Sequence, residues 1–363
     1  LREKREDEEF APQVIDGVNL RHVIDVRQRF GFSALLDYKL PFGKIKSSHF
    51  LSRLDREEEQ RRRRWDVGGN YQRYYWRARE RQLDIMTNTI GAELDFNSFE
   101  LDFNLSRSQS DTRYPFDNNI SVRQSGGFQQ GATTATTVQE LFDLSNIDLE
   151  DTYIYLGSSS TEIAVERNLV GEFDIKIPYN FTNWLAGTLK FGGKYRDKYK
   201  DRDEDYQHRR LDNRNEHIWW NHSQWGEPGF NYITNPGSGW PSILNYIDEG
   251  FDAGDFLNGK YEFGLGLDGE ELNYLFETFL ADSHQIISAL ADVDDFELDE
   301  KVASGFIMSE INLGQVFMLL PGIRYENTYL SMTGRRGNVP SELEEEEIDD
   351  PRVTDTTSTA SYY

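Results

Sequence analysis

The sequence predicts an all-β fold, an antiparallel transmembrane β-barrel to which this chain contributes about eight long strands. Three observations lead to this prediction: apolar and polar residues alternate along most of the chain, short turns alternate with long connections, and the composition is unusual for a soluble core. Only 37% of the 363 residues are hydrophobic, yet 13% are aromatic, including 19 Tyr and 23 Phe. A barrel with a polar interior, wet loops and aromatic belts has this composition.

The charge and the missing residue types exclude several classes of function. The net charge of -25 argues against nucleic acid as a partner, because phosphate binding needs a basic surface. There is no cysteine, so disulfides and thiolate metal sites are excluded. No run of roughly 18 apolar residues predicts a transmembrane helix. We find no catalytic or metal-ligating pattern, and we expect neither an enzyme nor a bound cofactor.

The pattern in the first half of the chain predicts two pairs of strands, preceded by a charged segment. Residues 1–28 are charged and weakly patterned, so we interpret them as a linker or the end of a preceding domain. Alternation begins near residue 29 and is broken by Pro41 and Gly43. A second strand starts near Lys44, a third covers about 71–96, and a fourth follows the turn at 97–98. One face of the first strand carries Phe30, Phe32, Ala34, Leu36, Tyr38 and Leu40.

The second half continues the pattern around two long loops. We expect a polar loop at about 112–157 and a second loop at about 200–296, both extracellular. Between them lies the hairpin "FDIKIPYNFTNWLAGTLKFGGKYRDK", and strands resume near Asp299. The turns after alternate strands are short, which is typical of the periplasmic side of outer-membrane barrels.

The hairpin at 173–198 raises the question of where its apolar face points. Aromatic residues gather near its turn, as in an interfacial belt, while charges of both signs fill the other face. We therefore predict that the apolar face meets lipid and the polar face lines a lumen; the alternative is a solvent-facing sheet of a soluble protein. The predicted lumen-facing residues are Glu172, Asp174, Lys176, Lys190, Lys194, Arg196, Arg324 and Glu326.

Four segments resemble strands of a known family. They are "LLDYKLPFGKIKSSHFLSRLDRE", "NLVGEFDIKIPYN", "LKFGGKYRDK" and "VFMLLPGIRYENTYLSMTG". They are similar to barrel strands of TonB-dependent outer-membrane receptors, in particular those of the Bacteroidetes type. The resemblance covers most of residues 25–335 and implies a barrel of about 22 strands around an N-terminal plug. We see neither a plug nor a TonB box, so we expect an internal piece of a longer protein, with residues 29–363 forming the first part of the barrel.

This resemblance implies a function as well as a fold. Such receptors sit in the outer membrane and import a scarce ligand, such as a siderophore, glycan, cobalamin or peptide, when the TonB complex pulls on the plug. The implied partners are outer-membrane lipid, the TonB complex and a small-molecule or oligomeric ligand. Two other readings stay open: a passive porin-like channel, and a soluble β-rich glycan-binding protein.

The loop at about 200–296 contains the best candidates for ligand contact. Exposed aromatic side chains on loops can stack on sugar or chelate rings, and a nearby histidine adds a hydrogen-bond donor. The same rings could instead pack together to hold the loop. The predicted ligand-binding residues are His217, Trp219, Trp220, Trp225, Tyr232 and Trp240. Helical spacing of Leu272, Leu275 and Phe276 also predicts a short helix in this loop.

Overall fold

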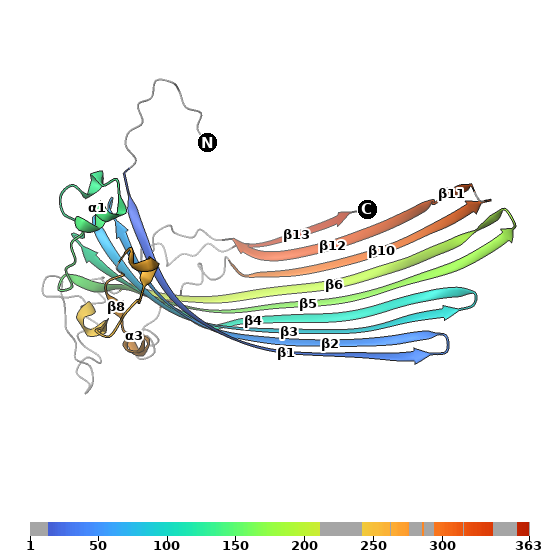
Figure 1. Cartoon of the computed structure of the whole chain (residues 1–363), viewed down its shortest axis with the longest axis horizontal. Helices are drawn as coiled ribbons and strands as arrows, with labels where there is room; N and C mark the ends of the chain where they lie inside the picture. The colour runs from blue at the N-terminus through green and yellow to red at the C-terminus, as the bar shows by residue number, and fades with distance from the viewer. Residues whose placement is uncertain are drawn as a thin grey trace, which may run out of the picture.

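One large antiparallel sheet dominates the computed structural model (Figure 1), which confirms the predicted all-β fold class. The structure describes residues 14–210, 242–261, 263–275, 285–286, 294–314, 316–336 and 354–362. The long strands are β1 (Gly17–Leu40), β2 (Gly43–Asp66), β3 (Tyr71–Phe96), β4 (Phe99–Ser125), β5 (Thr152–Thr182), β6 (Leu185–Arg210), β10 (Phe296–Leu313), β12 (Gly322–Arg336) and β13 (Thr354–Tyr362). The short elements are η1 (Ala132–Thr134), α1 (Val138–Asp143), η2 (Ile243–Tyr246), β7 (Ile247–Asp248), η3 (Phe256–Gly259), β8 (Gly266–Leu267), α3 (Gly269–Leu275), β9 (Gln285–Ile286) and β11 (Phe317–Leu319).

The long strands follow one another through the sheet in chain order, from β1 at one edge to β13 at the other. Every neighbouring pair is antiparallel, and β6 pairs directly with β10 across the long connection between them. β9 and β11 add short pairings to β6 and β10, while β7 and β8 form a separate small sheet. In the described part of the chain, no helix is long and apolar enough to cross a membrane.

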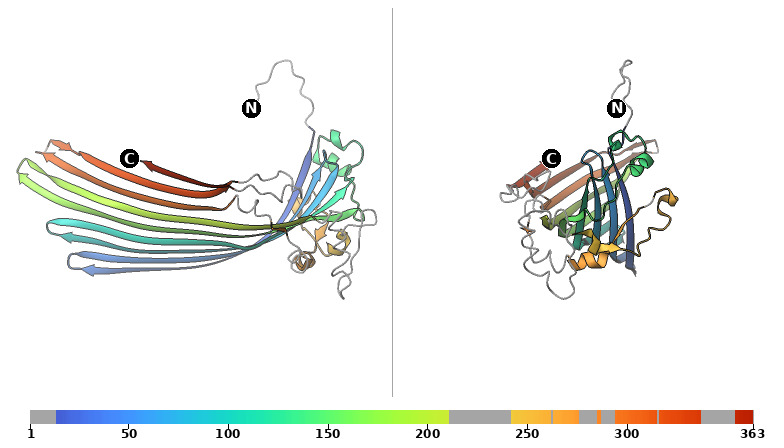
Figure 2. Two further views of the ribbon diagram at one scale, coloured as in Figure 1. Left: turned by 180° about the vertical axis from the view of Figure 1, so that it is seen from behind. Right: turned by 90° about the vertical axis from the view of Figure 1, so that its left-hand side faces the viewer.

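The two ends of the sheet differ. At the turn end, defined by the turns at 41–42, 97–98 and 183–184, consecutive strands are joined by a few residues. The far end carries the connections 67–70 and 126–151 and the described residues of the connection between β6 and β10. Figures 1 and 2 show that α1, α3 and β8 gather at the far end, while the turn end is bare strand. This asymmetry agrees with the short turns and long loops read from the sequence.

The sheet has two chemically distinct faces. Successive side chains of a strand point to opposite faces, and the register places Glu172 beside Asn104 and Lys194. We call the face that carries these residues the polar face. The register likewise places Phe173 beside Phe103, and their side is the apolar face.

β4 contains a bulge at Pro115 and Phe116. Asp117 pairs with Arg79 of β3 and with Ser160 of β5, whereas Tyr114 pairs with Glu162, so the register shifts by one residue on both sides of β4. Proline has no N–H to donate to the ladder and is tolerated inside a sheet mainly at bulges. The bulge reverses the alternation, so even-numbered residues of β4 lie on the apolar face beyond it.

The strands extend further than the sequence suggested. β4 continues to Ser125 and β5 begins at Thr152, so the connection between them is 126–151, not 112–157. The bulge explains the difference, because it interrupts the alternation on which the strand was recognised. β6 similarly runs to Arg210 through a stretch that is charged on both faces, and β1 begins at Gly17, inside the predicted charged segment.

All fully buried apolar side chains of the described residues lie toward the far end. There the connections fold over the apolar face and form two clusters with it. The first joins Tyr74, Trp76, Ile120, Val122 and Ile154 of the strands to Ile243, Tyr246, Leu267 and Leu272. The second contains Leu20, Trp65, Val67, Ala132, Ala135, Leu141 and Phe263. The predicted helix is present as α3, with Leu272 fully buried; Phe276 lies outside the described residues.

Polar groups fasten these connections to the strands. The Gln72 side chain is buried, donates to the carbonyls of Gly127 (2.9 Å) and Asn146 (2.8 Å), and accepts from Arg63 (2.9 Å). Arg61 donates to the carbonyl of Leu267 at 3.2 Å. The buried arginines therefore satisfy carbonyls of the covering segment, as buried polar groups must.

Toward the turn end, the apolar face has no cover among the described residues. Large side chains there are exposed, including Phe32 (57%), Leu36 (64%) and Ile323 (72%). A soluble monomer rarely exposes so extended an apolar surface. We call the half of the sheet next to the turn end the turn half, and the other half the far half. The turn half is thus a wall with one apolar side and one charged side.

Candidate functional site

The predicted lumen-facing residues all lie on the polar face. On β5 and β6, Lys194 Nζ lies 3.4 Å from Glu172, and Lys190 Nζ lies 4.0 Å from Asp174. Lys176 pairs with two β4 carboxylates, Glu100 at 3.2 Å and Asp102 at 3.5 Å. The remaining contacts join Arg196 to Glu300, and Arg324 to Glu326 at 2.6 Å.

The register brings the last two residues into line with the others. Glu326 of β12 lies opposite Ser304, which lies opposite Lys194, and Arg324 lies opposite Phe306. The structure thus joins the predicted residues into one polar surface that crosses β5, β6, β10 and β12. Their position toward a lumen stays a prediction.

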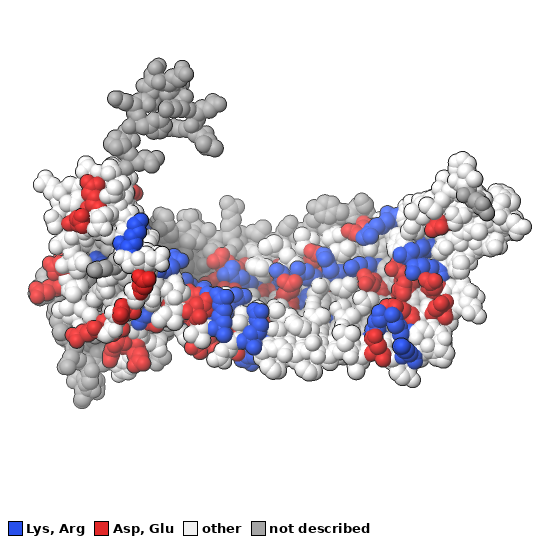
Figure 3. All heavy atoms as spheres, viewed as in Figure 1, with Lys and Arg blue, Asp and Glu red and all other residues white. Residues whose placement is uncertain are grey.

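The polar surface continues onto β2 and β3, where sequence reasoning did not select residues. Glu93 accepts from Lys44 (2.8 Å) and also contacts Lys46. These side chains and those of β4 and β5 line a groove of about 1000 Å³ near the turn end. Alternation in "PFGKIK" and "GAELDF" was the available signal for these residues. Figure 3 shows basic and acidic side chains interleaved across the strands in this region and again nearer the far end.

The predicted aromatic ligand contacts cannot be placed. His217, Trp219, Trp220, Trp225, Tyr232 and Trp240 all lie outside the described residues. They stay predictions.

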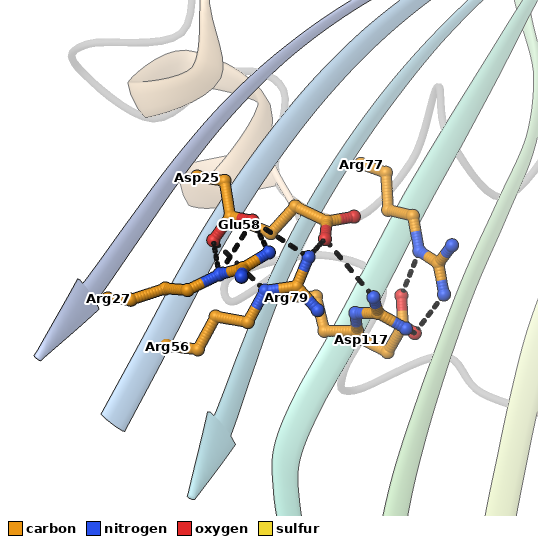
Figure 4. Close-up of polar contacts among 7 residues, drawn as sticks. All are labelled: Asp25, Arg27, Arg56, Glu58, Arg77, Arg79 and Asp117. Atoms are coloured by element: carbon orange, nitrogen blue, oxygen red, sulfur yellow. Dashed lines mark hydrogen bonds and ion pairs between the residues drawn. The ribbon is translucent and has the colours of Figure 1, made fainter. Parts of the chain in front are cut away.

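A second ion-pair network crosses β1 to β4 on the polar face nearer the far end (Figure 4). Asp25 accepts from Arg27 and, at 3.0 Å, from Arg56, which also reaches Glu58 at 2.5 Å. Arg79 joins Glu58 (3.2 Å) to Asp117 (3.9 Å), and Arg77 Nε donates to Asp117 at 2.6 Å. Every carboxylate of this chain of contacts is shared by two arginines.

The electrostatics of this network favour the ionised carboxylates. Hydrogen bonds from Arg27 and then Arg56 hold the pKa of Asp25 well below its usual range. Arg77 has a raised pKa, chiefly because of its hydrogen bond to Asp117. The network therefore behaves as a fixed lattice of charges on the strands.

The run "RRRR" at 61–64 is divided between the two faces by strand alternation. Arg61 and Arg63 are buried on the apolar face, where Arg61 also pairs with Glu59 at 2.9 Å. Arg62 and Arg64 lie on the polar face, and Arg64 pairs with Asp66 at 3.1 Å. Both ion pairs join residues two positions apart on β2, not residues of neighbouring strands. No group of acidic or histidine side chains suited to a metal ion occurs among the residues that the structure describes.

Comparisons with known proteins give a limited result. No family model matches the chain, and no curated protein matches it either. Among solved structures, the ferric-catecholate import receptor Fiu from E. coli K12 matches in its closed form with a TM-score of 0.39 and 9% identity, covering 97% of this chain and 47% of that chain. Its open form matches with a TM-score of 0.37 and 9% identity, covering 96% and 51%. The chain spans about half the length of the receptor chains it matches.

Proposed function

We propose that this chain forms part of the wall of an outer-membrane β-barrel that imports a scarce ligand by a TonB-dependent mechanism. The observation that carries the proposal is the uncovered apolar face of the turn half. Exposed apolar surface on this scale needs a cover, and lipid is a cover for a wall whose other side is charged.

The height of the apolar surface supports lipid as that cover. Apolar and small side chains occupy the apolar face over 30–40 of β1, 169–179 of β5, 185–195 of β6 and 303–313 of β10, apart from Ser309. These stretches have equal length, and they match the about 9–11 residues that a tilted strand needs to cross the hydrocarbon core. On the next strand position of the apolar face, toward the far end, stand Gln28, Arg167, Asp197 and Lys301. Asp197 and Lys301 lie directly opposite each other.

Aromatic side chains lie at both borders of this surface. Near the turns, Phe96 stacks between Phe42 and Phe99, with ring centroids 5.2 and 4.8 Å away, and Trp184 is 61% exposed. At the other border stand Phe30 (61% exposed) and Tyr195 (44% exposed). Aromatic rings favour the level of the lipid headgroups, so two belts separated by an apolar stretch support a membrane position.

The charged polar face supports a passage rather than a packed core. Its ion pairs link neighbouring strands while the groove beside them stays open. The far half of the strands extends beyond the apolar stretch and would stand above the membrane. In this arrangement, residues 29–363 supply the first part of the barrel, and the wall already begins at Gly17, within the segment 1–28 that would follow the plug.

The energy-coupled mechanism and the ligand classes rest on the strand-level resemblance to TonB-dependent receptors. Siderophores, glycans, cobalamin and peptides are the candidates that this resemblance supplies. An uptake assay tests the mechanism: import by cells that express the protein should stop when TonB is removed. Uptake that continues without TonB would contradict it and favour a passive channel.

Two neighbouring leucines test the membrane position directly. Leu35 lies on the polar face and Leu36 on the apolar face, halfway along the apolar stretch, and they are 75% and 64% exposed. Leu36→Arg should destabilise the folded protein by about 2–4 kcal/mol if that face meets lipid at the bilayer midplane. Leu35→Arg is the matched control, and it should have little effect. Unfolding of the protein in bilayers measures both.

The outcome that would contradict the proposal is equally specific. A sheet surrounded by water on both sides would tolerate both arginines, and the protein would then fractionate with soluble proteins. For the complete protein to which this chain would contribute, an outer-membrane band whose gel mobility changes on heating would be the independent sign of a closed barrel.

A further inference from the structure

Three arginines lie directly opposite one another on the polar face of the far half. Arg64 of β2 pairs in register with Arg73 of β3, which pairs with Arg123 of β4. Arg62 stands one position further along the same face of β2. Like charges that face each other across strands destabilise a sheet, so this arginine row calls for a compensating interaction.

Tyrosine rings hold the guanidinium groups in place. Arg73 and Arg123 both lie near the Tyr71 ring, at 4.6 and 4.8 Å from its centroid. Both also approach Tyr155, at 5.4 and 5.6 Å. Arg62 stacks on Tyr75 at 3.8 Å. Stacking of this kind fixes the plane of a guanidinium and leaves its N–H edges free to bind a planar oxyanion.

Among the described residues, one carboxylate pairs with the row. Asp66 pairs with Arg64, but it also accepts hydrogen bonds from the Tyr71 hydroxyl (2.7 Å) and from the Gly69 N–H (2.9 Å). Among the described residues, no carboxylate lies within ion-pair distance of Arg62, Arg73 or Arg123, whose buried Nε atoms also have no hydrogen-bond partner there. Burial lowers the pKa of the Arg62 guanidinium, and the Arg21 and Arg64 charges act in the same direction.

In the ion-pair network of Figure 4, by contrast, other arginines of the same strands pair with carboxylates. There, Asp25, Glu58 and Asp117 stand between the guanidinium groups. The arginine row lies in a chain whose net charge is -25, yet among the described residues Asp66 alone pairs with it.

We propose that Arg62, Arg64, Arg73 and Arg123, framed by Tyr71, Tyr75 and Tyr155, bind a small multivalent oxyanion that carries several carboxylate or phosphate oxygens. This inference rests on the proposed function in one respect, since it treats the anion as a ligand that reaches the polar face from outside the membrane. The Arg64 side chain is 43% exposed and the other three arginines are partly exposed, so a small molecule can reach the row. Charge-assisted, bidentate contacts would replace the repulsion between the arginines.

The test is calorimetric titration of the purified protein in detergent with citrate and, separately, with inorganic tripolyphosphate. The variant is R73Q/R123Q, which should weaken binding of the preferred probe by about tenfold or more, because two charged forks are lost. The control is R107Q/R113Q, which removes the same charge from the apolar face of β4 and should bind as the unsubstituted protein does. The two probes distinguish a carboxylate ligand from a phosphate ligand.

Two outcomes would overturn the proposal. Equal loss in the variant and the control would mean that overall charge alone governs binding. Failure of the unsubstituted protein to bind either probe at millimolar concentration would remove the site. A heat-shift gel of the complete barrel protein, run with each pair of substitutions and without them, separates these results from a failed barrel, because a protein that is not a barrel would lack the shift whether or not it binds the anion.

Discussion

The turn half and the far half of the sheet use the same strands and the same alternation. Their apolar faces differ in whether other parts of the chain cover them. In the turn half, Phe32, Leu36 and Ile307 stand exposed on strands without cover in the described structure. In the far half, Trp76 and Ile120 are buried beneath η2, β8 and α3. Alternation therefore identifies which side of a strand is apolar, but the connections decide whether protein covers it.

The covered half also differs in what its polar groups do. Gln72 and Arg63 bind carbonyls of the covering segments, whereas polar groups near the turn end pair with each other across strands. The far half is thus a folded domain built on the strands, and the turn half is a bare wall. The following four predictions are ordered from the largest expected effect to the smallest.

Removal of a large core side chain should affect only the far half. Trp76 is buried and its Nε1 donates to Glu59 at 2.9 Å. Trp76→Ala should cost about 3–5 kcal/mol of local stability, seen as faster hydrogen exchange and proteolysis in 242–275. Trp184→Ala, at an exposed position near the turns, is the control. Equal exchange in both variants would show that the cover does not depend on this core.

Loss of the buried amide should loosen the connection 126–151. Gln72→Leu removes two hydrogen bonds to carbonyls of that connection and one from Arg63. An unsatisfied buried group costs about 1–3 kcal/mol, so proteolysis between β4 and β5 should accelerate. Gln28→Leu, on an exposed part of β1, should leave the cleavage rate unchanged. Similar cleavage rates in the two variants would mean that the Gln72 hydrogen bonds do not hold this connection in place.

A glycine near the turn end tests the backbone of the bare wall. A Cβ at Gly187 would lie 1.9 Å from the Glu310 carbonyl oxygen and 2.6 Å from the Tyr179 hydroxyl, so Tyr179 covers this glycine. Gly187→Ala should cost about 1–3 kcal/mol through overpacking. Gly305→Ala, whose nearest contact would be 3.7 Å away, is the control. Urea unfolding in micelles measures both, and equal midpoints would contradict the close packing of β6 against β10.

Acidification should weaken the ion-pair network of Figure 4 slightly. The pKa of Asp25 is lower in the folded protein than in the unfolded chain, because Arg27 and Arg56 hydrogen-bond to the carboxylate. Its contribution is therefore present above the unfolded pKa of about 4 and is lost as the pH falls below it. Asp25→Asn should flatten the acid limb of the stability curve, measured by unfolding at a series of pH values. An unchanged limb would mean that Asp25 does not contribute to it.

Much of the fold could be predicted from the sequence because alternation is a local signal. It located the strands later seen as β1 to β6, β10 and β12, and it identified the side of β5 and β6 that carries the charges. It failed at Pro115, where one extra residue reverses the alternation, and at 200–210, where both faces are charged. The arginine row could not be predicted, because Arg64, Arg73 and Arg123 meet only through the register of three strands.

The bulge at Pro115 divides β4 into two parts whose side chains alternate in opposite phase. On the turn side of it, odd-numbered residues of β4 lie on the apolar face, and beyond it even-numbered residues do, whereas β3 and β5 keep one alternation past this point. One additional residue thus changes the side-chain phase of β4 alone. In a chimera joined at this height, the donated β4 must bring the extra residue with it, because without it every later side chain of β4 would move to the opposite face.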